Sequence, residues 1–128
     1  MNPYRALAAL AAALLVGACS SPAEPPAGAV DFVVSVSGEQ FVLRLTDPAT
    51  IQLAEENRLG RNTKFPIGPL RQGNGGFNGG WSWHLDPAET RMVDLAIEVC
   101  DGRPSYVEQH IPEYPSYCPW GAEVIRRR

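Results

Sequence analysis

The sequence predicts an α+β domain: an antiparallel sheet of about five or six short strands with one or two short helices and one disulfide. Three observations lead to this prediction. Apolar and polar residues alternate over residues 32–45 and 91–100, as half-buried strands require. A proline-initiated segment from residue 48 has the composition of a short helix. Twelve glycines and twelve prolines among 128 residues indicate many turns between short elements.

The first two strands are predicted to form a hairpin over residues 32–45. A two-residue turn at Gly38-Glu39 would place glycine where a type II′ turn needs a positive φ. This turn brings apolar residues together on one face, pairing Val36 with Phe41, Val34 with Leu43 and Phe32 with Leu45. A slip by one residue would turn these side chains away from the core.

A helix is expected next, over residues 48–59. Asp47 can cap its first turn, Pro48 suits the first helical position, and Gly60 is suited to end the helix. Residues 61–71 contain two prolines among apolar residues and are therefore predicted as a short, interrupted strand.

A second hairpin is predicted over residues 81–100. Its first strand presents Trp81, Trp83 and Leu85 on one face. After a loop at residues 86–90, the strand 91–100 presents aliphatic side chains on the same face: Val93, Leu95, Ile97 and Val99. This register places Trp83 opposite Val93 and Trp81 opposite Leu95, so that apolar residues again face each other.

The remaining chain is predicted to hold one more short helix and one more strand. Residues 101–104 resemble a helix entry and Pro112 would end the helix, with Val107 and Ile111 on its apolar face. Residues 123–125 would form a last short strand. The C-terminal Arg126-Arg127-Arg128 is expected to be a frayed, solubilising end, with contact to an acidic surface as the alternative.

The N-terminal segment has the pattern of a secretory signal. A basic start at Arg5 precedes the apolar residues 6–16, which are too few to cross a bilayer. The motif Val16-Gly17-Ala18-Cys19 resembles a bacterial lipobox, which implies a signal peptide over residues 1–18 and a lipid on the Cys19 sulfur. The alternative is an ordinary signal peptide with an incidental cysteine.

Residues 19–28 would then comprise the lipidated cysteine and a proline-rich, extended tether, which leaves 29–128 as a single domain. This organisation predicts an exported protein that is lipid-anchored to the cell envelope. Ser20, which follows Cys19 where aspartate would be the alternative signal, resembles sorting to the outer membrane if the host has one. The membrane, reached through the anchor, is the first expected partner.

The cysteine count supports the same organisation. With Cys19 lipidated, Cys100 and Cys118 remain as the natural disulfide pair of an exported protein. Closing a loop of about 18 residues would stabilise the fold by roughly 3 kcal/mol in the chain-entropy description.

Four motifs resemble a known family: residues 39–48 (EQFVLRLTDP), 81–87 (WSWHLDP), 95–104 (LAIEVCDGRP) and 118–120 (CPW). Together they resemble the small domain at the N-terminus of the cAMP-inducible prespore protein, which also occurs in many secreted proteins. The resemblance spans most of residues 32–126 and implies an exported, compact domain in which Cys100 and Cys118 match the paired cysteines. It implies no activity, and this sequence departs from the family pattern by extra glycine at residues 73–80.

His84, Asp94 and Glu98 form the candidate polar site. The predicted register places these residues on the sheet face opposite the tryptophans. One histidine with two carboxylates could bind a divalent cation or act as an acid–base pair. The alternative is structural, with Glu98 accepting hydrogen bonds and His84 as a solvated strand residue. No HxH or HExxH spacing is present, so no catalytic residue, metal ligand or cofactor is assigned.

Phe77 and Trp120 form the candidate ligand surface. Phe77 lies in the glycine-rich residues 72–80, which predict a flexible surface loop. Exposed aromatic rings of this kind could stack on sugar rings or on a peptide. Trp81 and Trp83 are expected in the core instead.

These observations favour a non-enzymatic lipoprotein whose small domain has a binding or structural role, with an envelope protein or a polysaccharide as its partner. One alternative is a metal-dependent or acid–base enzyme centred on His84, Asp94 and Glu98. Another is a carbohydrate-binding module that uses Phe77 and Trp120. The formal charge of −3 shows no basic excess, so no nucleic-acid partner is expected.

Overall fold

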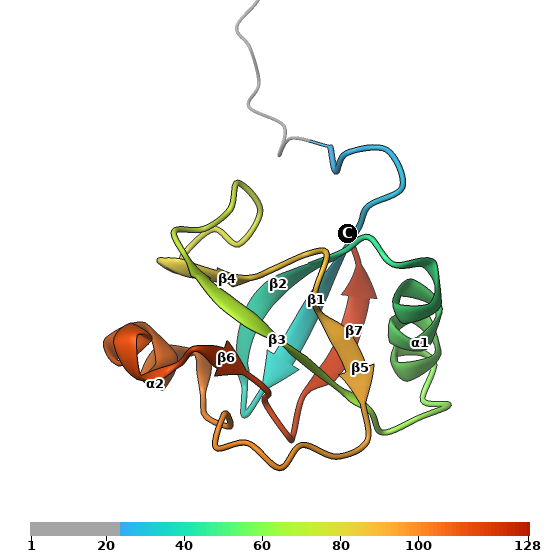
Figure 1. Ribbon diagram of the computed structural model, residues 1–128. Helices are drawn as coiled ribbons and strands as arrows, with labels where there is room; N and C mark the ends of the chain where they lie inside the picture. Colours follow the sequence, from blue (N-terminus) through green and yellow to red (C-terminus); the bar gives the residue numbers. More distant parts are fainter. Residues whose placement is uncertain (1–23) are drawn as a thin grey trace, which may run out of the picture.

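The computed structural model describes residues 24–128 and shows two antiparallel sheets (Figure 1). The first has the strand order β2-β1-β7, formed by β1 (Val30–Val36), β2 (Glu39–Leu45) and β7 (Glu123–Arg127). In the second, β3 (Phe65–Gln72) lies between β4 (Trp83–Leu85) and β5 (Arg91–Val93) and also pairs with β6 (Ser116–Tyr117). The predicted signal peptide, Cys19 and the start of the tether lie outside the described residues.

The α+β class is confirmed, with one difference in the sheets. Seven strands in two sheets replace the single sheet of five or six strands that the sequence predicts. The helices are short and lie outside the sheets, with α1 (Pro48–Arg58) beside β7 and α2 (Pro104–Gln109) beyond β6 (Figure 1).

The β1–β2 hairpin forms, but its predicted register is wrong by two residues. Each β1 residue pairs two positions earlier in β2 than predicted, so that Val34 faces Phe41 instead of Leu43. The turn residues are Ser37 and Gly38, whose φ angles of 50° and 83° are those of a type I′ turn. A shift by two residues keeps every side chain on its predicted face, so the apolar face still points to the core.

The helix α1 begins and ends as predicted to within a residue. Asp47 Oδ2 accepts hydrogen bonds from the backbone N–H and the hydroxyl of Thr50, at 2.9 and 2.7 Å. Pro48 occupies the first turn, where its missing N–H costs nothing. Gly60, with a φ of 74°, follows the last helical turn in the left-handed conformation that glycine adopts without strain.

The predicted hairpin over residues 81–100 is wrong. β4 and β5 do not pair with each other, because each pairs with β3: His84 lies opposite Arg71, and Met92 opposite Pro66. β3 itself is one uninterrupted strand of eight residues. The chain leaves the second sheet after Val93, and residues 94–99 form no strand. Alternation identifies the two faces of a strand but not its partner.

The C-terminal third holds a shorter helix than predicted. α2 ends at Gln109, and a single 3-10 turn, η1 (Ile111–Glu113), contains Pro112. Val107 is buried and Ile111 packs partly buried against the core, which confirms the predicted apolar face. No helix within residues 24–128 combines the length and the hydropathy that a membrane span requires.

The core contains residues of both sheets and includes the disulfide. The Phe41 ring centroid of β2 lies 5.4 Å from that of Trp83 in β4 and 5.8 Å from that of Tyr117 in β6. The predicted disulfide between Cys100 and Cys118 is present, and both cysteines are buried. It joins the end of the irregular segment 94–99 to the residue that follows β6.

Candidate functional site

Three aliphatic side chains project into solvent from the irregular segment 94–99. Leu95 is 74% exposed, Ile97 is 93% exposed, and Val99 is fully exposed. We call these three residues the apolar ridge. The sequence predicts the opposite orientation, with this face of a strand packed against the tryptophans, and that prediction is wrong. Single exposed aliphatic residues are ordinary in soluble proteins, but three at alternate positions of one segment form a continuous apolar surface.

The ridge is held in place by the residues between its members. Ala96 and Cys100 are buried, and the Cys100 carbonyl oxygen accepts a hydrogen bond from the backbone N–H of Cys118 at 2.8 Å. Glu98 Oε2 accepts a hydrogen bond from the hydroxyl of Ser116 at 2.9 Å. Asp94 pairs with the ammonium group of Lys64 at 2.6 Å. The segment is therefore tied to β6, to the residues before β3 and, through the disulfide, to the core.

Trp120 extends the ridge on one side. Together with Ile97 and Val99 it lines an open, mostly apolar hollow of about 470 Å³. The Trp120 side chain is about half exposed, and its backbone N–H donates to Asp101 Oδ1 at 3.0 Å. Glu98 and Asp101 also border the hollow, so an apolar floor carries acidic groups at its edge.

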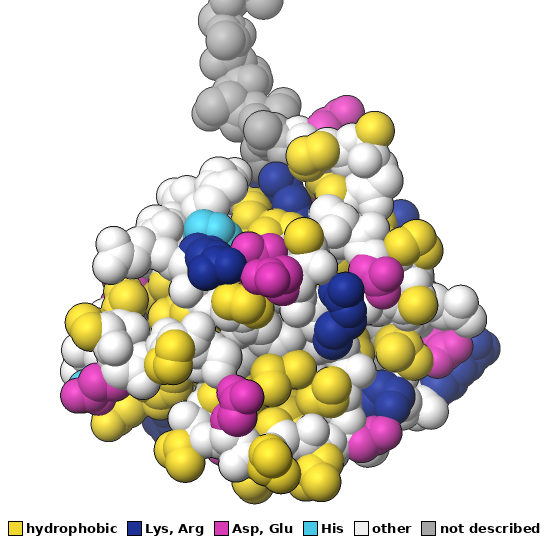
Figure 2. Space-filling view, in the orientation of Figure 1, with side chains coloured by type: hydrophobic (Ala, Val, Ile, Leu, Met, Phe, Trp, Pro, Cys, Tyr) yellow, Lys and Arg dark blue, Asp and Glu magenta, His cyan; other side chains and the backbone are white. Residues whose placement is uncertain are grey.

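The ridge and the entry of the N-terminal chain lie at opposite ends of the domain. In Figure 1 the orange segment after β5 runs along the lower edge, whereas the chain enters β1 from above. Figure 2 shows hydrophobic side chains gathered at the same lower edge. A partner bound there would contact the end of the domain that points away from the N-terminal tether.

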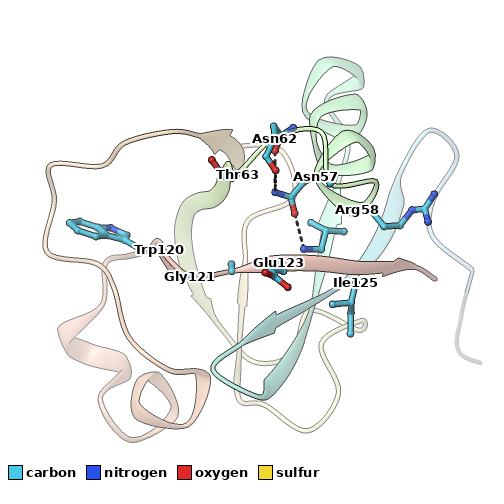
Figure 3. Close-up of a pocket in the computed structure, with 11 residues that line it drawn as sticks. Asn57, Arg58, Asn62, Thr63, Trp120, Gly121, Glu123 and Ile125 are labelled. Atoms are coloured by element: carbon cyan, nitrogen blue, oxygen red, sulfur yellow. Dashed lines mark hydrogen bonds between the residues drawn. The ribbon is translucent and has the colours of Figure 1, made fainter.

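A second hollow, of about 600 Å³, lies between α1, the residues before β3, and β7 (Figure 3). Asn57 closes one end of it: its Nδ2 donates to the carbonyl oxygen of Lys64 at 2.9 Å and to Asn62 Oδ1 at 3.0 Å. Asn62 Nδ2 in turn donates to the carbonyl oxygen of Leu53 at 3.0 Å. Because these amide groups bind the protein itself, this hollow is first of all a structural joint.

The three residues of the candidate polar site each have a different partner. His84 Nδ1 lies 2.7 Å from the carbonyl oxygen of Gly73, and its ring packs edge-on against Phe77 at 5.3 Å. Asp94 and Glu98 follow β5 rather than pairing with β4, and they bind Lys64 and Ser116. The structure does not join the three into one hydrogen-bonded group. Among the residues that the structure describes, no three histidine, cysteine or carboxylate side chains are placed to hold a metal ion.

Phe77 is not available to a ligand, because it is 6% exposed. The Arg44 guanidinium lies over its ring, 4.7 Å from the centroid. The neighbouring Asn78 is fully buried and bridges two strands, accepting from the N–H of Val42 at 2.8 Å and donating to the carbonyl oxygen of Trp83 at 2.8 Å. The predicted surface loop is therefore anchored at its centre, and Trp120 alone remains from the candidate ligand surface.

The shifted pKa values reflect structural bonds. Hydrogen bonds from the backbone N–H and the hydroxyl of Ser105 hold the pKa of Glu39 below its usual value. Burial raises the pKa of Tyr117, whose hydroxyl donates to the carbonyl oxygen of Gly102 at 2.6 Å. These shifts stabilise the charged carboxylate and the neutral phenol at neutral pH. Neither pKa moves toward neutral pH, as acid–base catalysis there would require.

Comparison with known proteins identifies the domain but not an activity. A family model for the N-terminal domain of the prespore protein matches residues 28–128. This agrees with the resemblance that the four sequence motifs carry. Neither the curated proteins nor the solved structures contain a match to the chain.

Proposed function

We propose, from the premise that this chain belongs to the family of the prespore-protein N-terminal domain, that it is an exported lipoprotein whose domain binds a protein of the cell envelope. The lipid on Cys19 would hold the protein at the membrane. The apolar ridge with Trp120 would be the binding surface. The observation that carries the proposal is the outward orientation of Leu95, Ile97 and Val99.

The anchor is supported by the sequence before the domain. The apolar residues 6–16 and the motif Val16-Gly17-Ala18-Cys19 have the pattern of a lipoprotein signal. The family match begins at residue 28, which leaves the proline-rich residues 20–27 as a spacer between the lipid and the domain. Two or three acyl chains on one cysteine hold a protein durably at a membrane.

The binding surface is supported by its free energy. Fully burying an aliphatic side chain contributes about 1.5–3 kcal/mol, and the ridge exposes three of them. Because Ala96 and the disulfide fix the backbone beneath, little conformational entropy is lost when a partner covers the ridge. This is the arrangement expected of a binding surface.

The chemistry of the hollow indicates the kind of partner. An apolar surface of the partner would cover Ile97, Val99 and Trp120, and basic side chains around it would complement Glu98 and Asp101. The ridge faces away from the end where the tether enters, so a partner other than the anchoring membrane fits it (Figure 1).

Site-specific photo-crosslinking in the native host tests the binding surface. A photoreactive residue at Ile97 is expected to give a discrete adduct with one envelope protein, whereas the same residue at the exposed Gln52 of α1 gives none. The isolated partner should bind the purified chain, and Ile97→Asp should weaken that binding at least about tenfold. Equal adducts at both positions, or unchanged binding by I97D, would refute the proposal.

Mass spectrometry of the mature protein tests the anchor separately. The expected N-terminus is Cys19 carrying a diacylglyceryl group, and Cys19→Ala should release the protein from the membrane fraction. A mature chain that begins elsewhere without a lipid would overturn this half of the proposal.

A further inference from the structure

The C-terminal arginines belong to the first sheet, whereas the sequence predicts a frayed end. Arg126 pairs with Val33 in the antiparallel pairing of β7 with β1. The backbone N–H of Arg128 donates to the carbonyl oxygen of Asp31 at 2.8 Å. The side chains of these arginines therefore extend from backbone positions that the sheet fixes.

Arg126 and Arg128 line one open hollow of about 230 Å³, together with Gln40, Val42 and Gly79. One guanidinium nitrogen of Arg128, Nη1, also lies 3.3 Å from the carbonyl oxygen of Phe77. Both arginines are exposed, and within residues 24–128 neither pairs with a carboxylate. Two guanidinium groups beside one hollow suit a phosphate group, which arginine binds through two parallel hydrogen bonds.

The acidic residues of the same sheet leave this charge uncompensated. Asp31, which holds the backbone of Arg128, is already neutralised by Arg44 through contacts of 2.7 and 3.0 Å. Glu123 lies at the other end of β7, where it pairs with Ser35. Arg126 and Arg128 thus form a local basic surface on a protein whose formal charge is −3.

This basic surface lies where the N-terminal chain joins the domain. The C-terminus is beside the start of β1 (Figure 1), and Arg128 is bonded to the second residue of that strand. Residues 20–28 can span at most about 30 Å when fully extended. A lipid on Cys19 would therefore keep Arg126 and Arg128 close to the headgroups. Any less extended path of the tether lets these charges come within the Debye length of about 8 Å from the membrane surface.

We propose that Arg126 and Arg128 dock the domain onto the anionic phospholipid headgroups of the membrane that anchors it. This inference rests on the proposed lipid anchor for its biological setting. The docked domain would present the apolar ridge at its opposite end, away from the bilayer. The arginines thus set the orientation of the domain, which a proline-rich tether alone does not fix.

Vesicle flotation tests the docking without the lipid. The mature chain from residue 19, carrying Cys19→Ser, is expected to bind vesicles that contain phosphatidylglycerol and not vesicles of phosphatidylcholine alone. The double variant Arg126→Gln/Arg128→Gln should bind about 25-fold more weakly, since each basic residue near an anionic surface contributes about fivefold. The matched control Arg61→Gln/Arg103→Gln removes the same charge from exposed residues elsewhere and should bind as the parent does.

Three outcomes would overturn the inference. The first is equal loss of binding in both double variants, which would indicate a net-charge effect. The second is release of the chain from vesicles by inorganic phosphate at constant ionic strength, which would indicate a site for free phosphate. The third is binding that depends on Ile97, tested with Ile97→Ser, which would place the membrane contact on the ridge. Because the assayed chain has no lipid, failure of the anchor proposal leaves this result unaffected.

Discussion

Asn57 Oδ1 accepts a hydrogen bond from the backbone N–H of Val124 at 2.9 Å, which joins the last turns of α1 to β7 across 67 residues of chain. The same side chain donates through Nδ2 to the residues that lead into β3. One amide therefore connects a helix, a strand of the first sheet and the segment entering the second (Figure 3).

Replacing Asn57 with alanine is expected to destabilise the domain by about 2–3 kcal/mol, because the partly buried N–H of Val124 and the carbonyl oxygen of Lys64 lose their partner. Urea unfolding followed by tryptophan fluorescence measures this difference. Gln52→Ala, on the exposed side of the same helix, is the control and should change stability by less than about 0.5 kcal/mol. Equal effects of the two substitutions would show that the Asn57 amide does not join these elements.

The disulfide is expected to stabilise the fold by about 3 kcal/mol, given the 18-residue separation of Cys100 and Cys118. The double variant Cys100→Ser/Cys118→Ser should lower the free energy of unfolding by that amount in thermal or urea denaturation. Because the disulfide also fixes the end of the apolar ridge, amide hydrogen exchange over residues 95–99 should rise more than exchange in α1. A uniform rise across the domain would contradict the local role.

The pair of Asp31 and Arg44 predicts an asymmetric response to mutation. Both side chains are largely buried, at 6% and 12% exposed, so Arg44→Ala leaves an uncompensated carboxylate and should cost about 3–5 kcal/mol. The double variant Asp31→Asn/Arg44→Gln removes both charges together and is expected to recover a substantial part of that loss. Denaturation of the two variants in parallel measures the difference. A double variant no more stable than Arg44→Ala would rule out the unpaired charge as the cause.

The cap of α1 predicts a loss of stability in acid. Hydrogen bonds from the hydroxyl and the backbone N–H of Thr50 hold the pKa of Asp47 below its ordinary value. A carboxyl whose pKa is lowered by folding adds stability above its unfolded pKa, and that stability is lost as the pH falls from about 4 through the folded value. Asp47→Asn keeps the cap but cannot titrate, so its urea midpoint should fall less than that of the parent between pH 6 and pH 3.

Thr50→Val provides the matching test of the cause. Valine keeps the shape of the buried Thr50 side chain but removes the hydroxyl donor, which is the larger cause of the lowered pKa. The acid-dependent loss should therefore shrink in this variant. An unchanged pH dependence in both variants would assign the acid sensitivity to another carboxyl.

The parts of the fold that can be predicted from the sequence are those determined by local chemistry. Asp47, Pro48 and Gly60 define a helix because capping, proline and positive φ act within a few residues. The faces of the β1–β2 hairpin follow from alternation. Its register does not, because a two-residue shift preserves every face, and only the turn at Ser37-Gly38 distinguishes the two.

The candidate site is harder to predict because its signal is inverted. Alternation over residues 91–100 is typical of a buried strand, and it assigns the larger aliphatic residues to the core. The informative residue is Cys100: a disulfide cysteine is usually buried, and Ala96 lies in its phase, so Leu95, Ile97 and Val99 must point outward. The grouping of His84 with Asp94 and Glu98 depends on a strand pairing that does not exist, since β4 and β5 both pair with β3.

The pairing of β3 with three separate strands has a consequence for how the domain can vary. Its residues 65–67, 68–69 and 70–72 bind β5, β6 and β4 in turn, so one strand serves as the common support for segments far apart in the chain. The connections between those segments, including the glycine-rich residues 73–80 and the ridge at 94–99, can therefore change in length or composition while the scaffold keeps its geometry. Members of the family are then free to acquire different specificities by exchanging these two connections alone.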